Sequence, residues 1–272
     1  MVRRRYVVVT VLAFSFAVLL SAQVLPDEEQ VWKAYICWLR TVQIAPDPEA
    51  YAAELWQNGV AEAEINRQVD IIARLSEERT EALAHHFDLV YSDPKAYFNA
   101  RPNALLVEAT KGLSPGTALD VAMGQGRNAV YLAQQGWDVT GFDISKKGLK
   151  AAQANAQKAG VRISTFHASD RTFDFGEDRW DLIVFSYAFV PISDPAFAER
   201  VRRSLRRGGL IVYENYFRDP KFPLPRFVGA PEPNTLPGVF SDLQILRYEE
   251  VREKGDWGPA GCPLVRMVAR KQ

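Results

Sequence analysis

Apolar runs and a helical pattern alternate between residues 117 and 145. An apolar run at 118–122 is typical of a buried parallel strand, and it is followed by a turn through Gly124 and Gly126. Apolar residues at helical spacing come next, and a second apolar run ends at Asp143, about 20 residues after the first glycine. The pattern predicts strand, turn, helix and strand, which is half of a nucleotide-binding βαβ unit.

The α/β alternation continues after this unit. The pattern predicts helix, strand, strand, helix and strand, at residues 146–159, 161–166, 180–187, 196–205 and 210–214. Residues 206–209, rich in arginine and glycine, predict the turn into the last of these strands. Two further strands, at 243–252 and 263–269, predict a C-terminal pair, and the proline-rich segment 220–237 predicts a long loop over the site.

The first part of the chain has a different character. Apolar and aromatic residues recur at helical spacing between residues 27 and 97, which predicts a helical pre-domain or lid. Residues 1–23 combine three arginines, an apolar run of about 14 residues and a small-residue end, which is typical of a signal peptide or, less well in length, a membrane anchor. The domains expected are therefore 1–23, 27–97 and 98–272, in an exported or membrane-associated protein.

Composition narrows the possible partners. The chain has 272 residues, and its 33 Lys and Arg are balanced by 33 Asp and Glu. No basic excess is present for a phosphate backbone, so no nucleic-acid partner is expected. Cys37 and Cys262 lie far apart in sequence, which favours two thiols over one disulfide. His85 and His86 would point about 100° apart on a helix, so no metal site is expected.

The residues around the first turn favour a nucleoside ligand. Gly124 and Gly126 lack side chains, so the backbone can turn tightly and a ligand can approach it. Asp143, at the end of the second strand, can accept hydrogen bonds from ribose hydroxyls. Ala129 completes a pattern that also fits a dinucleotide fingerprint. Asp120 argues against a dinucleotide ligand, because its carboxylate in the first strand would repel a pyrophosphate. The cationic amino-acid end of S-adenosylmethionine would instead be attracted to this carboxylate.

Residues 120–128, Asp-Val-Ala-Met-Gly-Gln-Gly-Arg-Asn, resemble the first motif of class I S-adenosylmethionine-dependent methyltransferases. The Gly-Arg-Asn continuation resembles the tellurite-resistance branch, and the resemblance covers residues 98–270. Ala122 departs from it, because the family usually has its first glycine there. The resemblance implies a Rossmann-like, doubly wound α/β fold with a mostly parallel seven-stranded sheet and an antiparallel C-terminal hairpin, preceded here by the helical region.

The resemblance also implies that the acid after the third strand, Asp170, meets the adenine amino group. Ser186 and Tyr187 end the fourth strand at the same sheet edge as the glycine turn and are candidates for the reaction site. The cofactor-binding residues predicted are Asp120, Gly124, Gln125, Gly126, Asn128, Asp143, Ile144, Asp170, Ser186 and Tyr187.

The expected activity is in-line transfer of a methyl group from S-adenosylmethionine to a small-molecule acceptor. This reaction depends more on positioning than on an acid, so no catalytic residue is assigned. A thiol or a chalcogen oxyanion would need little assistance from a base, because it is already partly or wholly ionised. An acceptor that must lose a proton could transfer it to Tyr187, His167 or Glu214. Two alternatives remain: a non-catalytic nucleoside-binding or interaction protein, and an NAD(P)-dependent oxidoreductase. Export is in tension with a cofactor made in the cytoplasm, although an inverted anchor could hold the domain at the cytoplasmic face.

Overall fold

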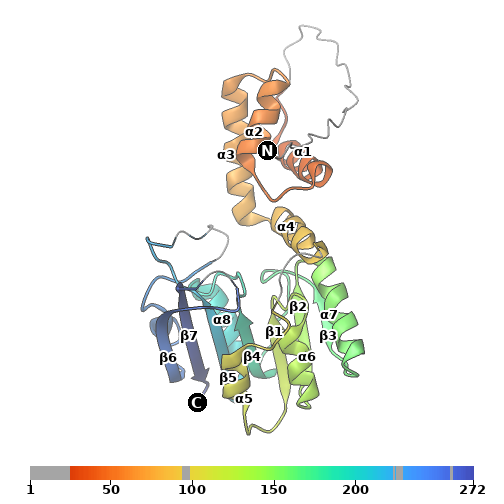
Figure 1. The fold of residues 1–272 in the computed structure, drawn as a ribbon. Coiled ribbons are helices and arrows are strands. Elements are labelled where there is room, and N and C mark those ends of the chain that lie inside the picture. The colour runs from red at the N-terminus through yellow and green to blue at the C-terminus, as the bar shows by residue number, and fades with distance from the viewer. Residues whose placement is uncertain (1–24, 94–98, 223, 225–228, 258–259) are drawn as a thin grey trace, which may run out of the picture.

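The computed structural model describes residues 25–93, 99–222, 224, 229–257 and 260–272 (Figure 1). The predicted signal peptide or anchor, residues 1–23, lies outside these residues. Figure 1 shows two layers: an α/β unit, and a helical layer that lies beyond the carboxyl ends of its parallel strands.

The α/β unit is built on one sheet of seven strands in the order β3-β2-β1-β4-β5-β7-β6. Neighbours among the first five strands are parallel, whereas β7 runs antiparallel to both β5 and β6. The predicted fold class is therefore confirmed. The strands are β1 (Thr117–Val121), β2 (Asp138–Asp143), β3 (Ser164–His167), β4 (Trp180–Ser186), β5 (Leu205–Tyr216), β6 (Gln244–Glu253) and β7 (Cys262–Arg270).

Helices cover both faces of this sheet because its central strands bury apolar side chains on both sides. Leu119 of β1 packs with Phe197 of α8 on one face, and Ala118 packs with Leu132 of α6 on the other. All four side chains have less than 2% of their surface exposed. The helices of this unit are α5 (Ala104–Thr110), α6 (Arg127–Gln134), α7 (Lys146–Lys158), α8 (Pro195–Ser204) and α9 (Leu236–Val239).

The strand order reverses beside β1, whose neighbours are β2 and β4. In an open α/β sheet this reversal leaves a crevice outside the carboxyl ends of the strands, where ligands bind. The glycine turn after β1 and the ends of β2 and β4 meet there. The topology therefore brings the predicted site residues to one edge.

The helical layer contains α1 (Glu28–Val42), α2 (Pro48–Gln57) and α3 (Glu62–Glu78), and α4 (Glu81–Ser92) leads from it to the sheet edge (Figure 1). Tyr35, Leu39 and Ile72 form the centre of a separate apolar cluster and are fully buried. No helix within the described residues is long and apolar enough to span a membrane. The division at residue 97 remains a prediction.

Two strands begin more than one residue away from their predicted starts. Strand β5 begins at Leu205, so residues 206–209 belong to its first part and not to a separate turn, because Leu205 pairs with Trp180 across a register shift. Strand β3 begins at Ser164, three residues later than predicted, where it starts to pair with β2.

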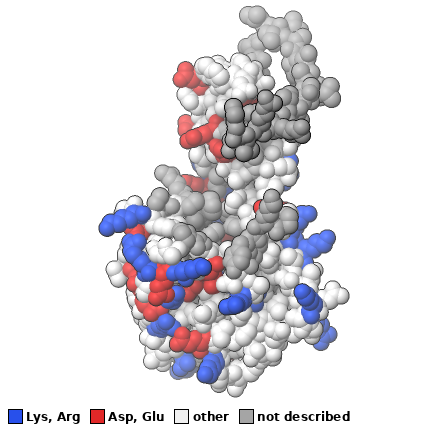
Figure 2. All heavy atoms as spheres, in the orientation of Figure 1, with Lys and Arg blue, Asp and Glu red and all other residues white. Residues whose placement is uncertain are grey.

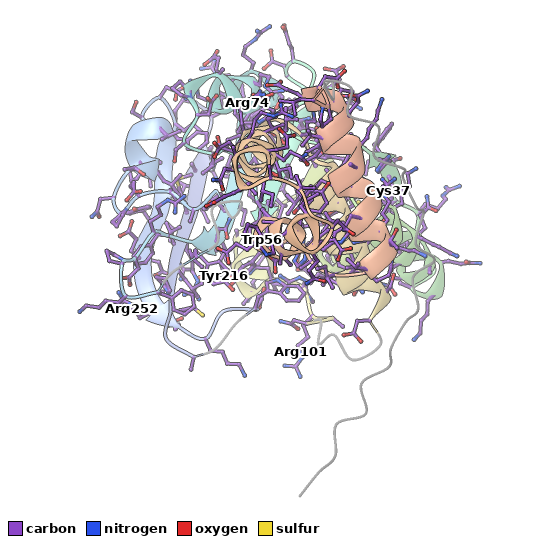
Figure 3. The ribbon with its side chains drawn as sticks, turned by 90° about the horizontal axis from the view of Figure 1, so that it is seen from above. Cys37, Trp56, Arg74, Arg101, Tyr216 and Arg252 are labelled. Carbon is purple, nitrogen blue, oxygen red and sulfur yellow. The ribbon has the colours of Figure 1, made fainter. Side chains whose placement is uncertain are left out.

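The two cysteines lie on different elements, and charged side chains of both signs gather at one end of the sheet. Cys37 is exposed on α1 (Figure 3), Cys262 is buried at the start of β7, and no disulfide joins them. At the β6–β7 end of the sheet, acidic and basic side chains lie interspersed on the face in Figure 2, and Arg266 pairs there with Glu249 and Glu253. The expected absence of a nucleic-acid partner remains a prediction.

Candidate cofactor and acceptor site

The turn after β1 depends on left-handed backbone at three positions. Ala122, Gly124 and Gly126 have φ of 53°, 52° and 73°. This region costs an L-residue roughly 1–2 kcal/mol, which glycine avoids. The structure thus explains why the resembling family favours glycine where this chain has Ala122. The alanine retains the turn at the expense of local strain.

The two glycines leave room for different neighbours. A Cβ on Gly126 would lie 2.9 Å from the Cβ of Ala152, so this glycine allows α6 to begin close against α7. A Cβ on Gly124 would collide with the hydroxyl of Tyr91 on α4. Gly126 lines neither of the cavities described below, so its part in ligand binding remains a prediction.

Asp143 holds the turn in place from the end of β2. One carboxylate oxygen accepts a hydrogen bond from the Gly124 N–H at 2.8 Å, and the other accepts from the Ser145 N–H at 2.7 Å. Burial raises the pKa of the Asp143 carboxyl. Each carboxylate oxygen can accept a second hydrogen bond, so both backbone contacts are compatible with a bound ribose.

Asp120 is a buried acid beneath the same turn. Its side chain is 2% exposed, and one carboxylate oxygen accepts a hydrogen bond from the Ala129 N–H at 3.1 Å. Burial raises the pKa of Asp120 to about 7. An ionised carboxylate at this depth is costly. The charge of Arg127 offsets part of that cost, and a cationic ligand in the adjoining cavity would offset more.

Two cavities adjoin Ala122 in the turn after β1. The larger, of about 440 Å³, is lined by the predicted residues Asp120, Gly124, Gln125, Asn128, Ser186 and Tyr187. The smaller, of about 80 Å³, is lined by Asp143, Ile144, Asp170 and again Tyr187. Nine of the ten predicted residues therefore line one cavity or the other. Phe87 and Tyr91 of α4 line both cavities and stand between the two groups of residues.

Helix α4 is fixed to the sheet edge by Asp88. Its carboxylate accepts hydrogen bonds from the Ser145 hydroxyl at 2.6 Å and from the Lys147 N–H at 3.0 Å, at the N-terminus of α7. A negative side chain is favourable at a helix N-terminus. Burial raises the pKa of Tyr91, so its hydroxyl, which faces Gly124, is neutral.

Tyr187 and Glu214 form a hydrogen-bonded pair at the ends of β4 and β5. The Tyr187 hydroxyl donates to a Glu214 carboxylate oxygen at 3.0 Å and accepts from the Asp256 N–H at 3.0 Å. Glu214 also accepts from the Asn103 amide at 2.7 Å and from the Arg266 guanidinium at 2.6 Å. Burial, and then the nearby Glu214 charge, raise the pKa of Tyr187.

Tyr187 also has a left-handed backbone, with φ of 56°. Such strain persists only where the surroundings hold it, and it concentrates at functional sites. The third candidate for proton transfer, His167, lies at the outer strand β3, where its Nε2 is 3.0 Å from the Ile144 carbonyl oxygen. The structure therefore joins Tyr187 and Glu214 by a hydrogen bond, whereas His167 lies on β3 at the edge of the sheet.

Arg127 is a site residue that the sequence prediction omitted. Its guanidinium pairs with Asp256 at 2.7 Å, donates to the Ser186 hydroxyl at 3.1 Å, and lies 5.7 Å from the ring centre of Trp257. The Gly-Arg-Asn sequence could have indicated Arg127 as a site residue. No sequence pattern indicates Asp256 or Trp257. Arg101, another cation near the turn, points away from the molecule (Figure 3).

A Rossmann-like sheet with this strand order, a glycine turn after β1, an acid ending β2 and a cavity at the switch point are features of the class I S-adenosylmethionine-dependent methyltransferase fold. Comparison with known proteins agrees: residues 118–209 match the methyltransferase domain family. The chain therefore carries a methyltransferase domain, and S-adenosylmethionine is the cofactor that this family implies.

Curated relatives point to the same class. A probable S-adenosyl-L-methionine-dependent methyltransferase TehB from Haemophilus influenzae is 29% identical over 185 residues, which is 63% of this chain and 64% of the relative. A ubiquinone biosynthesis O-methyltransferase from Nitrosomonas europaea is 28% identical over 157 residues, covering 56% of this chain and 67% of that protein. The first match thus spans less than two thirds of the relative's length.

Solved structures share the fold. The crystal structure of TehB from Haemophilus influenzae has a TM-score of 0.53 at 24% identity and covers 61% of each chain. The [4+2]-cyclase SpnF has a TM-score of 0.56 at 16% identity, covering 70% of this chain and 95% of its own. The same fold therefore also occurs in a protein that is named a cyclase and not a methyltransferase.

Proposed function

We propose that this protein transfers a methyl group from S-adenosylmethionine to a small-molecule acceptor. The observation that carries the proposal is the buried Asp120 carboxylate, which lines the larger cavity directly beneath the glycine turn. A dinucleotide would bring phosphates to this place, where a carboxylate would repel them. S-adenosylmethionine brings an ammonium and a sulfonium, and it supplies a methyl group activated for transfer.

In this proposal the two cavities hold one ligand. Asp120 binds the ammonium in the larger cavity, Asp143 accepts hydrogen bonds from the ribose, and Asp170 lies at the adenine end in the smaller cavity. Phe87 and Tyr91 stand between these groups, so α4 shifts to let the ligand extend from one cavity into the other. Helix α4 thereby also excludes water from the bound cofactor.

A small acceptor is supported by the dimensions of the site. The larger cavity has room for the amino-acid end of the cofactor and one small molecule, at about 440 Å³. It opens beside the ends of β4 and β5, where Tyr187 and Glu214 are hydrogen bonded. Tyr187 lines the cavity and would meet the acceptor, and Glu214 would act through its hydrogen bond to Tyr187.

The location of the protein is a separate proposal. We infer from the arginines and the apolar run of residues 1–23 that this segment directs the chain to a membrane. Cell fractionation with and without residues 1–23 tests it: the full chain should enter the membrane or exported fraction, and equal distributions would contradict the inference.

Ligand binding and turnover test the activity. The purified full chain should be stabilised against heat by S-adenosylmethionine and S-adenosylhomocysteine and unaffected by NADH, because ligands that bind the folded state raise its stability. Release of S-adenosylhomocysteine with an acceptor panel then separates an enzyme from a protein that only binds the nucleoside. Stabilisation by NADH alone would contradict the proposal.

A further inference from the structure

The larger cavity has an aromatic wall. Tyr187, Phe189, Tyr216 and Trp257 all line it, from the ends of β4 and β5 and from the segment after β6. The Tyr187 and Tyr216 rings pack edge to face with centres 5.4 Å apart. Aromatic rings present large apolar surfaces that bind flat apolar groups well.

The charges at this wall are already balanced. Among the described residues that line the cavity, Arg127 is the single cation, and Asp256 neutralises it at 2.7 Å. The cation behind the cavity, Arg266, pairs with Glu214 at 2.6 Å. Asp120 adds a further carboxylate. An anionic acceptor would therefore enter a buried site without a cation to receive it, which is costly.

Tyr187 is placed to receive a proton in the same cavity. Its hydroxyl gives its hydrogen to Glu214 and takes one hydrogen bond from the Asp256 N–H, so a second lone pair of the oxygen is available to a donor in the cavity. An oxyanion acceptor has already lost its proton and cannot donate one to the Tyr187 oxygen, whereas a neutral hydroxyl group can.

Building on the proposed function, we propose that the methyl acceptor is an uncharged molecule with a flat, apolar ring that carries a hydroxyl group, and that Tyr187 and Glu214 take up the hydroxyl proton. The ring lies against the aromatic wall. The hydroxyl donates its hydrogen bond to the Tyr187 oxygen. Asp256 keeps Arg127 neutralised, so the site discriminates against anions.

The step balances without a further reactant. The acceptor oxygen forms a bond to the methyl carbon as the bond from that carbon to sulfur breaks, and the electron pair of the broken bond stays on sulfur. The hydroxyl proton passes to the Tyr187 oxygen while the Tyr187 proton passes to Glu214. The products are the methyl ether, S-adenosylhomocysteine and a protonated Glu214, which later releases its proton to water.

A charge-matched pair of acceptors tests the substrate class. 4-Methylphenol and 4-hydroxybenzoate have the same ring and hydroxyl and differ in a methyl group against a carboxylate, and selenite represents an oxyanion without a ring. With the full chain we expect kcat/KM for 4-methylphenol at least tenfold above that for 4-hydroxybenzoate, and no turnover of selenite. Selenite or 4-hydroxybenzoate methylated as fast as 4-methylphenol overturns the inference and leaves the proposed function standing.

Absence of turnover is equally informative. If S-adenosylmethionine binds and none of the three acceptors is methylated, the inference fails. If S-adenosylmethionine does not bind, the proposed function fails first.

Asp256→Asn tests the charge argument within the same site. The amide retains the hydrogen-bonding shape and leaves Arg127 with its positive charge, so the preference for 4-methylphenol over 4-hydroxybenzoate should fall about tenfold. Asp242→Asn is the matched control, because Asp242 loses the same charge beside Arg202, away from both cavities. An equal preference in Asp256→Asn and the control overturns the charge argument.

Tyr187→Phe tests the proton transfer. Loss of general-base assistance should lower kcat for 4-methylphenol by about 10²–10⁴-fold. The loss for 4-methylthiophenol, whose thiol is much more acidic than a phenol hydroxyl and needs less help from a base, should be at least tenfold smaller. A purely structural role would lower both rates alike, and that result overturns the assignment of Tyr187 as a catalytic residue.

Discussion

Binding of S-adenosylmethionine should depend on pH through Asp120. Burial raises the pKa of this carboxyl to about 7, so below pH 7 it is mostly protonated and cannot pair with the ligand ammonium. Binding then requires release of the proton, and affinity falls about tenfold for each pH unit below 7. Between pH 7.5 and pH 5.5 the expected loss is roughly 25-fold, or about 2 kcal/mol.

Calorimetry in two buffers of different ionisation enthalpy measures both the affinity and the protons released. We expect nearly one proton released at pH 5.5 and about 0.25 at pH 7.5. The range stops at pH 7.5 because an α-amino group itself titrates near pH 8. Adenosine is the matched ligand: it lacks the ammonium and shares the ribose contacts at Asp143, whose pKa burial also raises.

The difference between the two ligands isolates Asp120. Adenosine should lose much less affinity on acidification than S-adenosylmethionine, and Asp120→Asn should make the two pH profiles alike. The reasoning would be refuted by equal pH dependence of the two ligands in the unmodified chain, or by an unchanged slope in Asp120→Asn.

Three other changes test separate parts of the site. Asp143→Ala should weaken S-adenosylmethionine binding by about 1–3 kcal/mol, the usual cost of losing charge-assisted hydrogen bonds, and equal calorimetric affinities would remove Asp143 from the site. Tyr91→Ala should speed S-adenosylmethionine association at least tenfold in stopped flow, because Tyr91 stands between the two cavities; an unchanged rate would show that α4 does not limit entry. Ala122→Gly should change the free energy of unfolding by less than about 1 kcal/mol, because relief of the left-handed strain is offset by the greater freedom of the unfolded chain. Ala122→Val should destabilise the fold by more than about 1 kcal/mol, and denaturant unfolding that ranks the valine above the glycine would contradict this account.

The sheet could be predicted from the sequence because its information is local. Buried parallel strands are continuous apolar runs, and glycines mark the ends of the helices between them. Once β1 and β2 are placed, the topology brings Asp120, Asp143 and Tyr187 to the same edge. The prediction was weaker at β5, because pairing of Leu205 with Trp180 across a register shift extends the strand through residues that have the composition of a turn.

The remainder of the site depends on packing between distant segments. Tyr91 faces Gly124 because Asp88 attaches α4 to the start of α7. No periodicity in the sequence predicts this contact. Arg127 pairs with Asp256, which is far away in the sequence and follows the edge strand β6. The close approach of Gly126 to Ala152 of α7 likewise depends on how the two helices pack.

A crystal structure of the full chain with S-adenosylhomocysteine tests the central claim most directly. We predict the ligand ammonium within hydrogen-bonding distance of Asp120, the ribose hydroxyls on Asp143, and the adenine beside Asp170, with Tyr91 moved from its position over Gly124. The ligand bound at another edge of the sheet, or with its ammonium away from Asp120, would contradict the account.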